Sequence, residues 1–192
     1  SSDSPVAQMS DQEFLQAKAT YFGLMTEIDE QLGRIFDYLK ATNQYDSTLI
    51  VFTSDHGEQL GDHYLFGKLG YFDASYHIPL IIRDPKRQLQ KVKTLEHFSE
   101  SVDVMPTILD WLGLEIPDQC DGRSLLPFLE NEVPRNWREE VHSEFDFRWI
   151  GSYQPMIEER FGLLPDECSL VIIRDADYKY VHMTALPPLF FD

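Results

Sequence analysis

Apolar residues recur at helical spacing near the start of the chain. Ser10 to Glu13 has the S-x-x-E form of a capping box, in which the serine hydroxyl and the glutamate carboxylate each accept a hydrogen bond from an otherwise unpaired backbone N–H. Steps of three or four then separate the apolar residues Phe14, Ala17, Tyr21, Met25, Ile28, Leu32, Ile35 and Leu39. This spacing predicts a helix over residues 11–40 whose apolar face packs against a sheet.

A short apolar run follows this helix. Residues 49–52 read LIVF, which is too short for a helix and rich in β-branched residues. We predict a fully buried strand over residues 48–53 and a second strand over 78–82, where the sequence reads IPLII. The helix and the first of these strands would form half of a βαβ crossover, which is typical of an α/β fold.

The later part of the chain has different patterns. Residues 104–112 predict a second helix, with Pro106 in its first turn and Gly113 as its C-terminal stop. After residue 133 the pattern favours strands, and the runs 169–174 and 178–183 predict a hairpin. We therefore expect a domain boundary here, with an α/β core over residues 1–132 and a small subdomain with antiparallel strands over 133–192.

Polar residues end the first strand abruptly. Asp55 and His56 follow it, and Gly57 lets the chain bend sharply after them. The carboxyl ends of strands are where open α/β sheets bind ligands. An Asp oxygen and a His nitrogen suit Mn²⁺, Zn²⁺ or Fe²⁺ better than a calcium site built from oxygens alone. The other interpretation is an Asp that caps the next turn beside a hydrogen-bonded His.

The loop between the two strands carries further charged residues. Lys68 lies twelve residues after His56 among glycines, where it is either a substrate-binding cation or a solvated surface lysine. His63 either orients a metal ligand or has a structural role. For His77, beside the start of the second strand, the structural role is favoured.

Composition excludes some classes of partner. The net charge of −17 and the pI near 4.6 argue against nucleic acid, whose phosphates demand a basic face. An anionic ester would need local positive charge, which a divalent cation and a lysine supply. No run of eighteen apolar residues occurs, so we expect no membrane partner. Cys120 and Cys168 are too few for a disulfide framework or a cysteine-rich zinc site.

Several long motifs resemble one family. The string SDHGEQLGDH, with Gly67, Lys68 and the strand YHIPLIIRDP after it, is similar to the C-terminal half of the alkaline phosphatase superfamily on its sulfatase branch. SVDVMPTILDWLGLEIPDQCDGRSLLPFL and DADYKYVHMTALPPLFFD resemble that branch's phosphonate monoester hydrolases. The resemblance implies a partial alkaline-phosphatase-like sandwich, with a buried, mainly parallel sheet flanked by helices, plus a small C-terminal antiparallel sheet.

The resemblance also implies roles for particular residues. In that family the residues matching Asp55 and His56 are ligands of one divalent metal ion, with Mn²⁺ or Zn²⁺ favoured here and Ca²⁺ if the protein is a sulfatase. The residue matching Lys68 contacts the bound ester and acts in catalysis. The family's nucleophile is a formylglycine made from cysteine in a C-x-P-S-R or C-x-A-x-R setting. Neither Cys120 nor Cys168 has that setting, so we expect the nucleophile outside this chain.

The chain is thus interpreted as the C-terminal portion of a metal-dependent hydrolase of phosphonate monoesters or phosphodiesters, inactive on its own. A sulfatase is the alternative within the class, and a non-catalytic scaffold or oligomerisation segment, served by the aromatic residues of 137–153, is the alternative outside it. We expect as partners a small anionic ester, the N-terminal part of the same protein and further copies of it. The first ten residues lack a secretory signal pattern, which favours the cytoplasm but leaves localisation open for a chain that begins in mid-protein.

Overall fold

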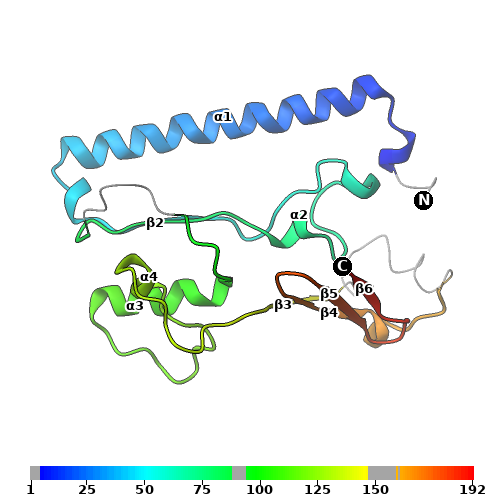
Figure 1. Ribbon diagram of the computed structural model, residues 1–192. Coiled ribbons are helices and arrows are strands. Elements are labelled where there is room, and N and C mark those ends of the chain that lie inside the picture. The colour runs from blue at the N-terminus through cyan, green and yellow to red at the C-terminus, as the bar shows by residue number, and fades with distance from the viewer. Residues whose placement is uncertain (1–4, 88–93, 147–158, 160) are drawn as a thin grey trace. The chain divides into compact units, whose positions relative to one another are not determined.

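The structure is a computed structural model that describes residues 5–87, 94–146, 159 and 161–192 (Figure 1). It divides into two compact units, Ser1–Val92 and Lys93–Asp192. Trp149 and the rest of residues 147–153, to which the sequence assigns a possible scaffold role, lie outside the described residues.

The first unit combines one long helix with two short strands. In chain order its elements are η1 (Pro5–Gln8), α1 (Asp11–Ala41), η2 (Tyr45–Ser47), β1 (Ile50–Thr53), η3 (Asp62–Tyr64), α2 (Asp73–Tyr76) and β2 (Leu80–Arg83).

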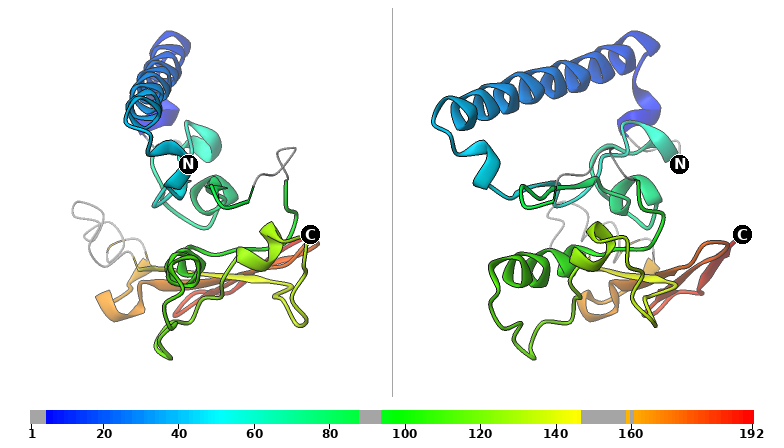
Figure 2. Two further views of the ribbon diagram at one scale, coloured as in Figure 1. Left: turned by 90° about the vertical axis from the view of Figure 1, so that its left-hand side faces the viewer. Right: turned by 60° about the vertical axis from the view of Figure 1, so that its left-hand side comes forward.

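The helix α1 begins where its capping box predicts. The Ser10 hydroxyl accepts a hydrogen bond from the Glu13 N–H at 3.3 Å, and the Glu13 carboxylate accepts one from the Ser10 N–H at 2.8 Å. These bonds to Ser10 lower the pKa of Glu13. The views of Figures 1 and 2 show α1 as one continuous helix. The predicted helix over 11–40 is confirmed.

The apolar face of α1 is not buried, contrary to the sequence prediction. No residue of α1 is buried, and Met25, Ile28 and Ile35 are each at least 50% exposed. Near its ends, α1 contacts the unit through Phe14 against Phe66 and Phe36 against Tyr45, in both cases with ring centroids 6.3 Å apart. A sheet two strands wide cannot cover a helix of this length, which explains the exposure.

The two strands of this unit pair antiparallel. Ile50 faces Arg83 and Thr53 faces Leu80 in the register of β1 and β2. The described residues of the unit contain no parallel pair, so the mainly parallel sheet that the resemblance implies is not formed by these strands. The prediction of a fully buried strand is also wrong for this chain, because Ile50 and Val51 are half-buried and Phe52 is exposed.

The second unit has short helices followed by a sheet. Its described elements are η4 (Ser101–Asp103), α3 (Val104–Leu112), α4 (Leu126–Leu129), β3 (Val141–Asp146), η6 (Pro165–Glu167), β4 (Ser169–Arg174), β5 (Lys179–Met183) and β6 (Leu189–Phe191). Pro106 lies in the first turn of α3, and Gly113 ends it with φ 71° in the left-handed region, as the sequence predicts.

The strands β3, β4, β5 and β6 form one antiparallel sheet in that order. Ile172 of β4 faces Val181 of β5, and both are buried together with Leu170. The turn between these two strands closes with a hydrogen bond from Asp175 N–H to Tyr178 O at 3.0 Å. The predicted hairpin and the small C-terminal antiparallel sheet are confirmed.

Other contacts of this unit cross the boundary expected after residue 132. The indole N–H of Trp137 donates to Phe98 O at 2.7 Å, and Arg138 forms an ion pair with the fully buried Asp103. The compact units therefore divide between residues 92 and 93 rather than after 132. The expected division into two domains, residues 1–132 and 133–192, stays a prediction.

The remaining sequence expectations concern the thiols and the membrane. In the described part of the chain neither cysteine forms a disulfide, and Cys168 is buried while Cys120 is half-buried. Among the described residues, no helix combines the length and the apolar character that a membrane crossing requires.

Candidate functional site

The candidate site begins at the end of β1. Ser54 leaves the strand and its hydroxyl donates to His56 O at 2.7 Å, which turns the chain just where the two candidate ligands stand. The side chain of Asp55 is 84% exposed and that of His56 is 36% exposed. The strand end thus presents a carboxylate and an imidazole to the surface of this chain.

The ring of His56 is held by the backbone of the next residue. Nδ1 lies 2.8 Å from Gly57 O. Because a carbonyl oxygen only accepts hydrogen bonds, Nδ1 carries the proton, and in the neutral ring Nε2 presents its lone pair. A backbone carbonyl on the second ring nitrogen is the usual support of a metal-binding histidine.

The spacing of the two donor atoms fits a shared metal ion. Asp55 Oδ2 lies 3.7 Å from His56 Nε2, and Asp55 Oδ1 accepts a hydrogen bond from the His56 N–H at 3.0 Å. Two ligands that bind one ion at about 2.0–2.2 Å are roughly 3–4 Å apart for the usual coordination angles. Within the described residues, however, no group of three or more His, Cys, Asp or Glu is placed to hold a metal ion. The pair supplies two donors, whereas hydrolytic metal sites commonly use at least three protein ligands.

Gly57 closes the loop that carries the site. Its N–H donates to Ser75 O at 2.9 Å, and a Cβ at this position would lie 1.9 Å from the carbonyl oxygen of Ala74. Only glycine allows so close an approach of two backbone segments. The glycine of the DHG triplet is therefore required by the local packing.

Lys68 lies later in the same loop, between Gly67 and Leu69. It is exposed, and its ammonium group has no hydrogen bond or ion pair with any residue that the structure describes. Gly67 before it and Gly70 after it have φ angles of 76° and 91°. The lysine thus stands on a tightly turned segment with its charge free to meet a ligand.

The other two histidines of the loop do not join the pair. His63 is exposed and stacks on Phe72, with ring centroids 3.7 Å apart and an interplanar angle of 8°. His77 is exposed, and its backbone N–H donates to Asp73 O at 2.7 Å. Within the described part of the chain, neither ring has a hydrogen bond to Asp55 or His56.

Three residues that the sequence analysis did not single out hold the loop together. Glu58, Gln59 and Tyr76 all bond to its backbone or side chains. Tyr76 donates its hydroxyl to Gly70 O at 2.8 Å, and burial raises its pKa to about 12. In the sequence, Glu58 and Gln59 belong to a polar run after the DHG triplet, which marks a loop. The sequence pattern does not indicate which of these side chains are buried.

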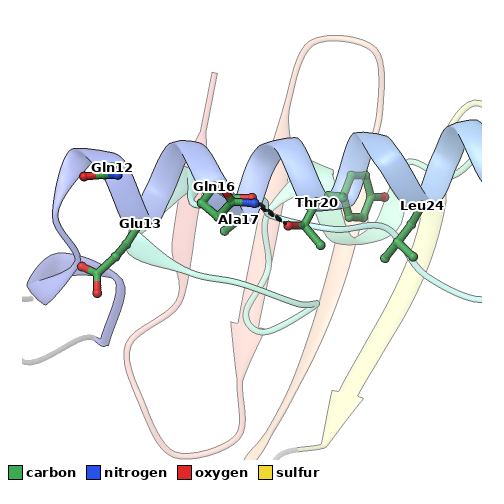
Figure 3. Close-up of a pocket in the computed structure, with 7 residues that line it drawn as sticks. Gln12, Glu13, Gln16, Ala17, Thr20 and Leu24 are labelled. Atoms are coloured by element: carbon green, nitrogen blue, oxygen red, sulfur yellow. Dashed lines mark hydrogen bonds between the residues drawn. The ribbon is translucent and has the colours of Figure 1, made fainter.

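A shallow groove lies elsewhere in the same unit. It runs along α1 and contains none of the predicted site residues (Figure 3). On its wall, Gln16 donates to the Thr20 hydroxyl one turn further along α1 at 3.3 Å. Of the candidate site residues, Asp55 and Lys68 are exposed and His56 is partly exposed.

The chain is similar to known protein families. A model described as "Sulfatase" matches residues 2–114, which is more than half of the chain. The chain belongs to the sulfatase family. A second model, "N-sulphoglucosamine sulphohydrolase, C-terminal", matches residues 61–184. The Asp55–His56 pair and Lys68 thus lie within the matched sulfatase region.

Individual relatives of this sulfatase-family chain include hydrolases of two kinds. The multifunctional alkaline phosphatase superfamily protein PehA of Trinickia caryophylli is 57% identical over 97% of this chain, which spans 36% of PehA. An arylsulfatase of Clostridium perfringens is 38% identical over 69% of this chain and is matched over 28% of its own length. The chain therefore spans about a third of the length of the curated relatives it matches.

Solved structures agree with this assignment. The phosphonate monoester hydrolase of Agrobacterium radiobacter is 48% identical with a TM-score of 0.83, over 91% of this chain and 34% of that one. The phosphonate monoester hydrolase of Silicibacter pomeroyi is 44% identical with a TM-score of 0.87, over 98% and 37%. The alkaline-phosphatase-like α/β fold that the resemblance implies is confirmed.

Proposed function

We propose that this chain is the C-terminal third of a metal-dependent hydrolase that cleaves phosphonate monoesters and phosphodiesters. The observation that carries the proposal is the placement of Asp55 Oδ2 and His56 Nε2, 3.7 Å apart at the end of β1. The identity with two phosphonate monoester hydrolases supports this substrate class over others.

Asp55 and His56 would hold one divalent cation, for which Mn²⁺ or Zn²⁺ suits the mixed oxygen and nitrogen donors. When bound, such an ion offsets charge on an ester oxygen and lowers the pKa of an attacking hydroxyl group. Gly57 O keeps the His56 proton on Nδ1, so that Nε2 remains the donor atom. The remaining ligands and the formylglycine nucleophile belong to the part of the hydrolase outside these 192 residues.

Lys68 supplies the second local positive charge. Its ammonium group has three N–H donors and is not held by any described carboxylate. It binds the non-bridging oxygens of the ester and stabilises the negative charge that grows on them in the transition state. In a chain of net charge −17, such local positive charge is needed to attract an anionic ester.

A sulfate ester is the second candidate substrate. The arylsulfatase of Clostridium perfringens and a choline-sulfatase of Rhizobium meliloti, 33% identical over 92% of this chain, favour it. A sulfatase would hold Ca²⁺ as its ion. The same two donors and the same lysine would serve both esters.

The test compares two esters with the same leaving group in the full-length hydrolase. We expect kcat/KM for an aryl phosphonate monoester to exceed that for the matching aryl sulfate, and both activities to be lost on metal removal and regained with Mn²⁺ or Zn²⁺. A higher kcat/KM for the sulfate would make the protein a sulfatase. Turnover of neither ester, with no dependence on metal, would leave the scaffold as the remaining interpretation.

A further inference from the structure

The buried residues of the first unit are polar. Gln59 is 1% exposed and Ser75 is 3% exposed, and Asp84 is the third buried residue among those that the structure describes in this unit. Burying an amide or a hydroxyl is unfavourable unless it gains hydrogen bonds, so such residues point to a specific task. Gln59 and Ser75 lie in the loop that carries the candidate site.

Glu58 and Gln59 hold the residue that precedes Lys68. The Glu58 carboxylate accepts hydrogen bonds from Gly67 N–H at 2.7 Å and from Leu60 N–H at 3.0 Å. The Gln59 N–H donates to Gly67 O at 2.9 Å. Both polar groups of the Gly67 backbone are therefore fixed by the two residues that follow the DHG triplet.

The Gln59 side chain holds the residue that follows Lys68. Its Nε2 donates to Leu69 O at 3.3 Å and to the Ser75 hydroxyl at 2.6 Å. Its Oε1 is buried and has no hydrogen-bond partner among the described residues. Leaving a buried oxygen without a hydrogen bond is unfavourable, so stability alone does not explain an amide at this position. The contribution of the Gln59 side chain to the loop is therefore its two hydrogen bonds to Leu69 O and the Ser75 hydroxyl.

We propose that Gln59, with Glu58, positions Lys68 relative to the Asp55–His56 pair. Three residues after His56, Gln59 bonds to the backbone on both sides of Lys68 and, through Ser75, to the segment that closes on Gly57. The Lys68 side chain has no hydrogen bond or ion pair with any described residue, so its reach toward a bound ester is set by where its backbone is held. Gln59 is a positioning residue that acts through Lys68, and this inference rests on the role proposed above for that lysine.

The test is a double-mutant cycle on kcat in the full-length hydrolase. Gln59→Met keeps the length of the side chain but removes both donor bonds, and a displaced Lys68 should lower kcat by roughly tenfold to a hundredfold. In the Lys68→Ala background the same change should lower kcat by less than about twofold, because the residue through which Gln59 acts is gone. Metal content should be unchanged in all four proteins.

Two controls separate positioning from folding. Gln16→Met makes the same replacement on the exposed face of α1, where Gln16 donates only to Thr20, and should leave kcat unchanged. Glu58→Gln keeps an accepting oxygen for Gly67 and should retain most of the activity that Glu58→Met loses. If Gln59→Met does not fold, Ser75→Ala, which removes only the hydroxyl partner, takes its place in the cycle.

The possible failures are distinguishable. Unchanged kcat in folded Gln59→Met, or an equal loss of kcat in both backgrounds, overturns the positioning role while the role of Lys68 stands. Unchanged kcat in Lys68→Ala overturns the role of the lysine itself, and the positioning role with it.

Discussion

At the scale of single residues, Lys68 and the Asp55–His56 pair differ in how they are held. The imidazole is fixed by Gly57 O, and the lysine only through its backbone neighbours. This difference separates their expected effects on the hydrolase. Loss of a metal ligand changes metal content, whereas loss of the lysine changes only the rate of the reaction.

Lys68→Ala in the full-length hydrolase should lower kcat by about 10²–10³, the scale seen when one donor to a transition-state oxygen is removed. Metal content measured on the same preparation should stay normal. The matched control is Lys40→Ala, an exposed lysine of the same unit whose partner is Asp37 at 3.8 Å. Equal kcat in the Lys68→Ala and Lys40→Ala variants would show that Lys68 is a solvated surface lysine without a role in catalysis.

Tyr76 predicts a pH dependence of stability. Burial raises the pKa of Tyr76 in the folded protein to about 12, above the value of 10.0 for an unperturbed tyrosine. The fold therefore favours the protonated hydroxyl, and this contribution is fully present below pH 10 and is lost as the pH rises toward 12. The unfolding free energy of wild type minus that of Tyr76→Phe should accordingly shrink between pH 10 and 12. A difference that stays constant over this range would contradict the assignment.

Sequence alone singled out the candidate residues of the site but not the residues that support them. Asp55, His56 and Lys68 stood out because charged residues after an apolar strand are unusual and because a family resemblance covered them. Gln59 and Ser75 did not, since their burial depends on hydrogen bonds between residues ten and sixteen positions apart. A polar residue in a loop is usually exposed, and only coordinates reveal the exception.

At the scale of elements, local signals predicted well and long-range packing did not. The capping box at Ser10, Gly113 after α3 and the turn at Asp175 act within a few residues, and each was confirmed. The burial of α1 and of β1 depends on surfaces far away in sequence. Within the described residues, no residue of α1 is buried and the residues of β1 are half-buried or exposed.

The second unit depends on one buried ion pair. Asp103 is fully buried, accepts hydrogen bonds from the N–H groups of Glu100 and Arg123, and forms a bidentate pair with Arg138. The hydrogen bond to Asp103 raises the pKa of Arg138, which keeps it charged. Arg138 also lies 3.2 Å from the Glu100 carboxylate, whose other oxygen accepts from the His142 N–H.

Arg138→Met should therefore destabilise the protein by about 3–5 kcal/mol, because the Asp103 carboxylate would remain buried without its counter-charge. Denaturant unfolding measures this change. Adding Asp103→Leu to the same variant removes the uncompensated charge and should recover part of the loss. If the free energy of unfolding of Arg138→Met fell by less than about 1 kcal/mol, the Asp103–Arg138 pair would contribute no more than a solvent-exposed salt bridge does.

At the scale of the whole molecule, the proposed function gives this chain half of a site. It offers two candidate metal donors and a candidate substrate-binding lysine, and neither of its cysteines has a formylglycine setting. The purified 192-residue chain should consequently give no metal-dependent turnover of aryl phosphonates or aryl sulfates. Turnover well above the blank, dependent on added metal, would contradict the half-site account.

The central claim is that Asp55 and His56 bind a metal ion in the full-length hydrolase. Elemental analysis of metal per protein chain tests it most directly, with wild type, Asp55→Asn, His56→Ala and His56→Asn compared and His63→Ala as the control. We predict about one ion per chain in wild type and in His63→Ala, a large loss in Asp55→Asn and His56→Ala, and in His56→Asn a shift in preference toward Ca²⁺, because an amide oxygen replaces the imidazole nitrogen. Full occupancy with unchanged metal preference in the His56 variants would contradict the claim.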